Sequence, residues 1–249
     1  MKNASSLRDY TLWSVMCLCL LILSLLAAWH LLATQNFPYR TWYDVLALGE
    51  NIEEYGPVNV SKKDFHLTDK PQHISLFAGI VDGIQHEPDT LSDIRYLANG
   101  QSHQLLHEAE LIHLKDVHQL VQQAYRAGAA VLAFMVILAV VLVKLKSPLP
   151  DLWRLHLVAA LVIAAGAAAL ALFGAEAVFY QLHIWAFPEG HQWYFFYEES
   201  LMSTMMKAPV LFGGIALELV VLALFLYSAA LLILKRFWPA AGNEKADNL

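Results

Sequence analysis

The chain has 249 residues, of which 58% are apolar and 15% are charged. An ordinary soluble domain carries roughly 25% charged residues, so this composition disfavours a wholly soluble protein. The net charge of −6 leaves no basic surface for a phosphate backbone, which disfavours nucleic-acid binding. The two cysteines, Cys17 and Cys19, lie in one apolar stretch, so the sequence predicts neither a disulfide framework nor a cysteine-based metal site.

Four apolar stretches are long enough to cross the roughly 30 Å hydrocarbon layer of a bilayer as helices. They predict membrane spans at 11–33, 127–146, 152–174 and 209–234. The first stretch resembles a signal peptide, but it is too long for one and no Ala-x-Ala site follows it closely. We therefore expect an uncleaved anchor and an all-α, four-helix membrane bundle.

Basic residues next to the spans predict the orientation, because lysine and arginine resist translocation. The flanking basic residues are Lys2, Arg8, Lys144, Lys146, Arg154, Lys235 and Arg236. They predict cytoplasmic segments at 1–10, 147–151 and 235–249. The segments 34–126 and 175–208 are then external, and the first of them forms a mostly helical domain.

The second half of the first external segment predicts two helices. Thr90 and Asp93 form a capping-box pattern, and Asn99-Gly100 ends this first short helix. Ser102 is expected to cap another helix that continues into the second span. The first half, residues 35–76, contains interfacial aromatic residues and turns and predicts no function.

Three polar residues of this second helix form its candidate catalytic group. Glu110, His113 and Asp116 stand at i, i+3 and i+6, which aligns them on one helix face near the bilayer surface. The two carboxylates can hold the His113 ring in one tautomer and stabilise its imidazolium, as a general base requires. A salt-linked helix face without catalytic function is the alternative.

His183 lies in an aromatic stretch before the last span, among Phe179, Trp185 and Phe187. An imidazole that is partly desolvated by such neighbours favours its neutral, proton-accepting form. The alternative is a histidine of the interfacial aromatic belt that donates to a backbone carbonyl.

The remaining histidines and one membrane carboxylate have simpler interpretations. Glu218 stands close to mid-membrane and predicts either a proton path or a hydrogen bond that joins two helices. His30 and His156 are expected near span ends. The histidines expected at the solvated surface are His66, His73, His86, His103, His107 and His118.

The order of these motifs resembles the bacterial lipoprotein intramolecular transacylase (Lit) family of four-span membrane proteins. The resemblance rests on Glu110-Leu-Ile-His113-Leu-Lys-Asp116-Val117 running into a span, and on Leu182-His183-Ile-Trp-Ala-Phe187 with Trp193 before the last span. It implies that His113 and His183 are catalytic and that Glu110 and Asp116 support them. The stretch 191–208 has no assigned place in this resemblance.

The resemblance also implies a reaction and a location. An acyl chain moves from the glyceryl sn-2 ester of a lipoprotein's diacylglyceryl-cysteine to the α-amine of that cysteine. The implied partners are membrane lipid and a lipoprotein N-terminus, and the implied location is the bacterial inner membrane. The cytoplasmic location of both chain termini is predicted by the flanking basic residues.

The residues fit this chemistry without the resemblance. The attacking amine must lose a proton and the leaving alkoxide must gain one, so two histidines suffice and we expect no cofactor or metal. The sequence has no Gly-x-Ser-x-Gly elbow and no cysteine outside the first span, which argues against an acyl-enzyme. Two alternatives stay open: a zinc hydrolase that binds the metal with His113, His183 and Glu110 or Asp116, and a non-enzymatic envelope scaffold or assembly factor.

Overall fold

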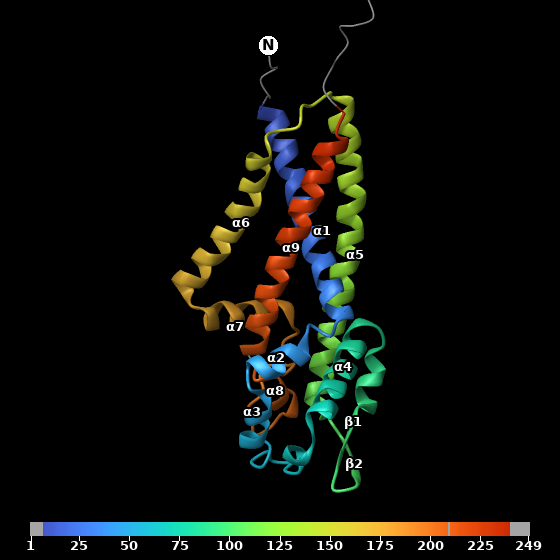
Figure 1. Ribbon diagram of the computed structural model, residues 1–249, viewed down its shortest axis with the longest axis vertical. Helices are drawn as coiled ribbons and strands as arrows, with labels where there is room; N and C mark the ends of the chain where they lie inside the picture. Colours follow the sequence, from blue (N-terminus) through green and yellow to red (C-terminus); the bar gives the residue numbers. More distant parts are fainter. Residues whose placement is uncertain (1–6, 209, 240–249) are drawn as a thin grey trace, which may run out of the picture. The chain divides into compact units, whose positions relative to one another are not determined.

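The computed structural model describes residues 7–208 and 210–239, and Figure 1 shows their arrangement into helices and one small sheet. In this part of the chain, four helices are long and apolar enough to cross a membrane. They are α1 (Leu7–Thr34), α5 (Glu108–Lys144), α6 (Leu152–Phe173) and α9 (Val210–Phe237). The prediction of an all-α membrane protein with four apolar helices is confirmed.

Three of the predicted segment boundaries involve residues that the structure does not describe. The predicted amino-terminal segment 1–10 is described only from Leu7, and the predicted tail 235–249 only as far as residue 239. Pro209, the predicted first residue of the fourth span, also lies outside the described residues.

Helix α5 is much longer than a membrane span requires. Its 37 residues extend for about 55 Å, whereas the hydrocarbon layer is roughly 30 Å thick. The apolar run of the helix begins near Ala127, so residues 108–126 precede this run. This preceding part carries Glu110, His113 and Asp116 on a helix that continues into the apolar run without a break.

The described chain divides into two compact units, which are considered separately. The membrane unit comprises residues 7–28, 125–178 and 219–239. The head unit comprises residues 29–124 and 179–218, with Pro209 again excepted.

The membrane unit is held together by a buried apolar cluster and a few internal hydrogen bonds. Tyr227 on α9 donates to the carbonyl oxygen of Leu155 on α6 at 2.7 Å. Trp13 Nε1 on α1 donates at 3.2 Å to Ser147 Oγ, which follows α5. The buried members of the cluster are Trp13, Met16, Cys17, Leu21, Leu138, Leu142, Leu155, Ala159, Tyr227 and Leu231.

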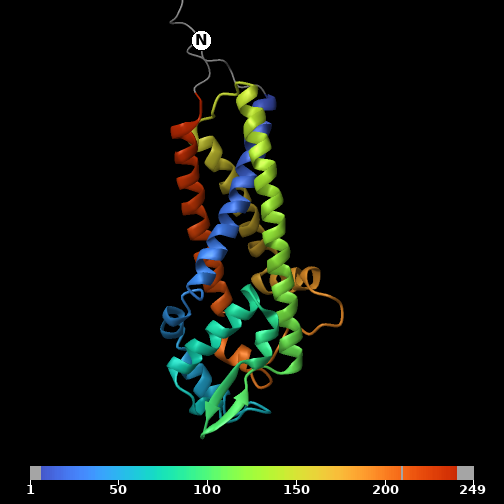
Figure 2. The ribbon, with the colours of Figure 1, turned by 90° about the vertical axis from the view of Figure 1, so that its right-hand side faces the viewer.

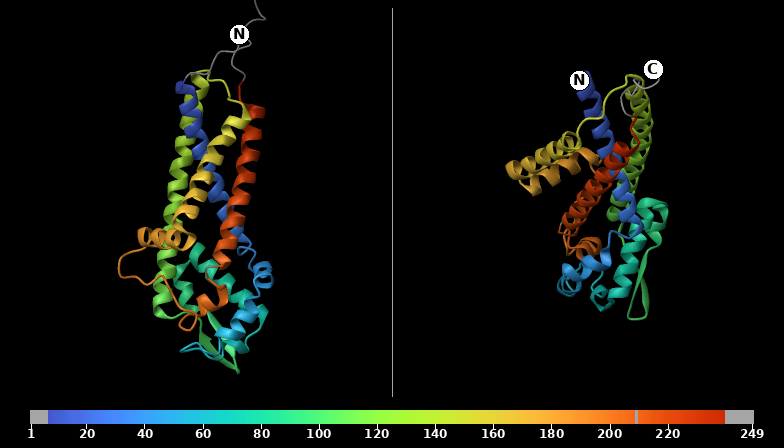
Figure 3. Two further views of the ribbon diagram at one scale, coloured as in Figure 1. Left: turned by 90° about the vertical axis from the view of Figure 1, so that its left-hand side faces the viewer. Right: turned by 45° about the horizontal axis from the view of Figure 1, so that its top comes forward.

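Helices α1 and α5 approach each other closely within the membrane unit (Figure 3). A Cβ atom added at Gly128 on α5 would lie 2.4 Å from Leu26 Cδ1 on α1, so a larger residue there would require the Leu26 side chain to move. Gly166 on α6 makes no such close approach, because a Cβ there would meet no atom of the described chain within 4 Å.

The head unit contains the short helices and the hairpin that surround the first part of α5. In chain order these elements are α2 (Tyr39–Val45), α3 (Leu48–Tyr55), η1 (Phe65–Leu67), α4 (Lys70–Gln85), η2 (Pro88–Asp93), β1 (Arg95–Ala98), β2 (Gln101–Gln104) and α8 (Leu201–Met206). Helix α7 (Ala175–Ala186) begins in the membrane unit and enters the head unit at Phe179.

The predicted helix between Thr90 and Asn99 is wrong, because this segment forms the 3₁₀ turn η2 and then strand β1 (Figure 2). Asn99 and Gly100 have φ values of +51° and +75° and connect β1 to β2 in a tight hairpin. Two consecutive positive φ values are typical of an Asn-Gly hairpin turn, and this turn chemistry outweighs the capping-box pattern. Ser102 therefore lies in β2 opposite Leu97 and caps no helix.

The aromatic residues of segment 35–76 were expected at a membrane interface, but three of them lie in the head core. Phe37, Tyr39 and Tyr43 are each less than 10% exposed. Tyr39 stacks on Phe77 of α4 with a centroid separation of 4.0 Å. The segment is therefore a structural part of the head unit.

His73 on α4 is also buried, at 2% exposure, so the prediction of a solvated histidine is wrong here. Thr68 Oγ1 donates to the Phe65 carbonyl, so His73 Nε2 donates to Thr68 Oγ1 at 2.6 Å. Tyr43 in turn donates to His73 Nδ1 at 3.0 Å. Both ring nitrogens have partners, which makes burial of the neutral ring acceptable.

Burial of His73 predicts a head unit that loses stability in acid. Desolvation lowers the pKa of His73 to about 4, and the charge of Asp69 only partly opposes this shift. Because the folded pKa lies below the unfolded value of about 6.5, protons bind preferentially to the unfolded chain between these values. The stabilisation is complete above pH 6.5, and roughly 3 kcal/mol is lost as the pH falls toward 4.

The loss of stability can be measured as the decrease in the melting temperature of the detergent-solubilised protein between pH 7.5 and pH 4. His73→Gln keeps one donor and one acceptor but does not titrate, so its melting temperature should depend less on pH in this range. Equal pH dependence in the two proteins would contradict the role given to His73.

Candidate functional site

His113 lies on the part of α5 that precedes the apolar run, and its ring is held between two phenylalanines. The ring centroid lies 4.9 Å from that of Phe187 and 5.9 Å from that of Phe195. Its Nδ1 atom is buried and has no hydrogen-bond partner in the described chain. Burial, together with the nearby His183, lowers the pKa of His113 to about 4, while Asp116 acts in the opposite direction. The ring is therefore neutral at neutral pH.

His183 on α7 is held by a backbone hydrogen bond and by aromatic rings. Its Nδ1 lies 2.8 Å from the carbonyl oxygen of Phe179, and because a carbonyl only accepts, Nδ1 carries the hydrogen. Nε2 is then a proton acceptor. The ring packs against Phe179 at 3.9 Å, Trp193 at 4.8 Å and Phe187 at 5.4 Å between centroids. Burial lowers the pKa of His183, and the bond to Phe179 opposes the shift.

The two histidines come from distant parts of the sequence and meet at one side chain. Both rings contact Phe187, and the pKa of His113 responds to the charge of His183. The expected neighbour Trp185 is 74% exposed, and Trp193 packs on His183 in its place. The head unit thus brings together two neutral imidazoles in an aromatic environment.

The carboxylate of Asp116 pairs with a histidine that the sequence analysis did not single out. Asp116 Oδ2 lies 2.7 Å from His191 Nδ1. The Asp116 side chain is 10% exposed and that of His191 is 41% exposed. Asp116 still acts on His113 through its charge, because it favours the protonated form of that ring.

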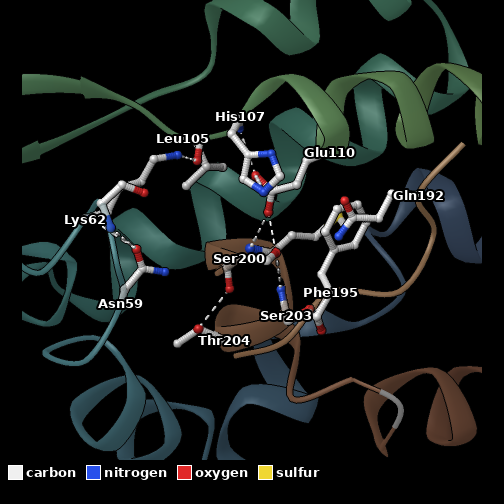
Figure 4. Close-up of polar contacts among 12 residues, drawn as sticks. Asn59, Lys62, Leu105, His107, Glu110, Gln192, Phe195, Ser200, Ser203 and Thr204 are labelled. Carbon is white, nitrogen blue, oxygen red and sulfur yellow. Dashed lines mark hydrogen bonds and ion pairs between the residues drawn. The ribbon is translucent and has the colours of Figure 1, made fainter. Parts of the chain in front are cut away.

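Glu110 is fully buried and forms the centre of a polar cluster (Figure 4). Its Oε2 accepts a hydrogen bond of 2.8 Å from the backbone N–H of His107, the residue before α5. This is half of a capping box, in which the third helical residue bonds back to the N-cap. Its Oε1 accepts from the Ser200 hydroxyl and, at 3.3 Å, from the backbone N–H of Met202. Glu110 thus binds the chain around α8 and does not hydrogen-bond His113.

The stretch 191–208, for which no function was predicted, is bound to other parts of the head unit. All six residues of α8 are buried, and Ser200 caps the helix by accepting from Ser203 N at 3.0 Å. Asn51 donates to the Thr204 carbonyl at 2.7 Å, and Tyr39 donates to the Met205 carbonyl at 2.9 Å. A serine before an apolar run is an N-cap signal, so this short helix could have been predicted.

Glu218 was predicted to form either a proton path or a hydrogen bond that joins two helices. Glu218 Oε2 is buried without a hydrogen-bond partner among residues 7–208 and 210–239, so no bond from this atom joins two described helices. A proton path through Glu218 stays a prediction.

No group of three or more His, Cys, Asp or Glu side chains in the described chain has an arrangement that could hold a metal ion.

Comparisons with known proteins agree with this architecture. The sequence model of the family described as lipoprotein intramolecular transacylase Lit matches residues 84–208. This range contains His113, His183, Glu110 and Asp116.

A solved structure, the in meso structure of the membrane integral lipoprotein intramolecular transacylase Lit from Bacillus cereus with one histidine replaced by arginine, has a similar fold. The TM-score is 0.64 at 14% sequence identity, and the match covers 93% of this chain and 95% of the other. No curated protein matches the chain significantly. Because the matched residues make up half of its length, this chain belongs to the lipoprotein intramolecular transacylase Lit family.

Proposed function

We propose that this protein is an intramolecular acyltransferase that uses His113 and His183 as an acid/base pair. Its substrate is a lipoprotein with an N-terminal diacylglyceryl-cysteine, and the acyl chain moves from the glyceryl sn-2 ester to the cysteine α-amine. The observation that carries the proposal is the meeting of two neutral imidazoles at the ring of Phe187. Family membership supports the reaction class.

The reaction needs one proton to be removed and one to be delivered. The amine nitrogen attacks the ester carbonyl carbon, and the new C–N bond forms as the amine proton passes to a neutral imidazole. When the tetrahedral intermediate collapses, the C–O bond breaks and the glycerol oxygen takes a proton from an imidazolium. The products are an amide and a free glycerol hydroxyl, and the histidine pair ends with as many protons as it had at the start.

The electrostatics of the two rings suit this role. Burial lowers the pKa of both histidines, so each is available as a base at neutral pH. His183 directs its hydrogen to Phe179 and thereby keeps Nε2 as an acceptor. The Nδ1 of His113 has no hydrogen-bond partner in the described chain, so no other protein group in that part competes for it. Nucleophile and ester belong to one molecule, which supplies a large proximity advantage.

The aromatic surroundings fit an acyl substrate. Phe179, Phe187, Trp193 and Phe195 pack around the two imidazoles and limit the access of water, which would hydrolyse the ester. Glu110 and Asp116 act as supporting carboxylates, the first by fixing the chain around α8 and the second by its charge near His113.

We also propose that the head unit lies outside the inner membrane, with both chain termini in the cytoplasm. The basic residues Lys144, Lys146 and Arg154 flank the turn between α5 and α6, and Lys235 and Arg236 end α9. Because such clusters stay cytoplasmic, the opposite ends of these helices would face the periplasm, where lipoprotein substrates are exposed.

Mass spectrometry of a model lipoprotein made in cells tests the proposed activity. The N-terminal peptide should carry an N-acyl group and lack one glycerol-linked chain only in cells that contain this protein. An unchanged peptide in cells with and without the protein would remove lipoprotein as its substrate.

Three further measurements separate this proposal from the two alternatives. A scaffold would perform its cellular role in a variant with both His113 and His183 replaced by alanine. A zinc hydrolase would release a free fatty acid and would contain stoichiometric zinc after purification. The proposed transacylase would release no free fatty acid, because it transfers the acyl chain to the cysteine α-amine.

A further inference from the structure

The segment from Phe187 to Ser200 connects α7 to α8 and contributes three of the rings around the proposed site. Phe187 contacts both histidines, Trp193 contacts His183, and Phe195 contacts His113. The segment itself has no regular secondary structure beyond turns. Its rings therefore stay in place only if the segment is anchored at other points.

Two polar contacts tie this segment to α5, one at its carboxyl end and one in its middle. At its end, Ser200 donates to Glu110, and Ser203 Oγ donates at 3.0 Å to the carbonyl of Phe195 (Figure 4). In its middle, His191 donates from Nδ1 to Asp116 at 2.7 Å. Glu110 and Asp116 stand three residues before and three residues after His113 on the same helix. The two ties therefore flank His113.

The contact between His191 and Asp116 has the features of an anchor. The Asp116 side chain is only 10% exposed, so its charge has few water molecules to replace a lost partner. His191 lies between Phe187 and Trp193 in sequence, and holding it against α5 restricts both rings. The exposed side chain of His191 and its engagement through Nδ1 favour an anchoring role over contact with the reacting atoms.

We infer that His191 is a positioning residue that, through its pair with Asp116, fixes the segment 187–195 against α5 and so holds the aromatic rings around His113 and His183. The inference rests on the proposed transacylase function for its activity readout. It also assigns a role to part of the stretch 191–208, for which the family resemblance supplied none.

The kinetic test compares His191→Ala with His191→Gln, using a purified enzyme in detergent and a synthetic diacylglyceryl-cysteine peptide. The alanine variant should lower kcat by about 10-fold or more and change KM by less than about threefold, because misplaced catalytic groups mainly affect the transition state. The glutamine variant can still donate to Asp116, so its kcat should recover to within about threefold of the wild-type value.

A matched control is available in the head unit. His86 Nδ1 lies 2.8 Å from Asp82 Oδ1, and both residues are on α4. His86→Ala removes the same kind of pair without touching the segment 187–195, and it should leave kcat unchanged. Wild-type kcat in His191→Ala, or equal losses in the alanine and glutamine variants at unchanged melting temperature, would overturn the positioning role.

Hydrogen exchange separates a failure of this inference from a failure of the proposed function. Peptides from 187–200 should exchange faster in His191→Ala than in the wild type, while peptides from α4 should be unchanged. If these peptides lose protection but the wild type transfers no acyl chain, the anchor is correct and the proposed function is wrong. Unchanged exchange of 187–200 in the alanine variant would exclude the anchor whatever the activity.

Discussion

Replacement of His113 or His183 by alanine is expected to reduce acyl transfer at least about 100-fold, because each change removes a group that moves a proton in the transition state. A variant with both histidines replaced should be about as slow as either single variant, since the histidines act as one unit. Both rings are held mainly by aromatic packing and one backbone bond, so the variants should accumulate normally. The measurement is the initial rate of N-acyl product formation, followed by mass spectrometry.

The matched control for this prediction is His118→Ala on the same helix. His118 bonds through Nδ1 to the Ile84 carbonyl at 2.9 Å and has no assigned part in the chemistry. The activity of the His118→Ala variant should be within about twofold of the wild-type activity, as is usual for changes outside a catalytic site. If His113→Ala or His183→Ala keeps more than half of the wild-type rate, the acid/base assignment is wrong.

The second large effect is expected on stability and concerns Glu110. Its fully buried carboxylate accepts from the Ser200 hydroxyl, the Met202 N–H and the His107 N–H. Glu110→Ala leaves these donors without an acceptor, and each buried unsatisfied donor costs about 1–3 kcal/mol. We expect a loss on the order of 3–5 kcal/mol in the free energy of unfolding, together with detachment of α8 from the start of α5.

Thermal melting in detergent measures this loss. Glu110→Gln keeps one acceptor oxygen and should lose less stability than the alanine variant. Glu108→Ala removes an exposed carboxylate from the same turn and should melt within about 2 °C of the wild type. A Glu110→Ala protein that melts like the wild type but is inactive would show that Glu110 belongs to the chemistry and not to the scaffold.

The membrane fold could be predicted because its signal is local. Backbone groups in lipid must bond within their own segment, so an apolar run of sufficient length specifies a helix without knowledge of its neighbours. The incorrect predictions of secondary structure and burial lie in the head unit, because several local sequence signals compete there to determine the structure. The Asn99-Gly100 turn outweighed the capping-box pattern of Thr90 and Asp93 and produced a hairpin.

His73 shows why burial in the head unit could not be predicted. Its partners Tyr43 and Thr68 are supplied by different parts of the fold, and they remove the cost of burying the ring. A polar residue in polar sequence is usually exposed, so no local pattern distinguishes His73 from the exposed His86.

For the site, the sequence identified the residue types but not all of their partners. His113 and His183 stay predictions as catalytic residues, now with a shared contact at Phe187. The spacing of Glu110 and Asp116 suggested that both would hold His113. The structure gives their hydrogen bonds to Ser200 and His191, which come from the loop before the last span. A contact between segments so far apart leaves no periodic pattern in a single sequence.

Acyl transfer by His113 and His183 can be tested with purified protein and one labelled substrate. A diacylglyceryl-cysteine peptide with an isotopically labelled sn-2 acyl chain is incubated with the wild type and with the His113→Ala and His183→Ala variants. We expect the label to move to the cysteine α-amine within the same molecule, and with the wild type only. Label recovered as free fatty acid, or transfer by the alanine variants at the wild-type rate, would contradict it.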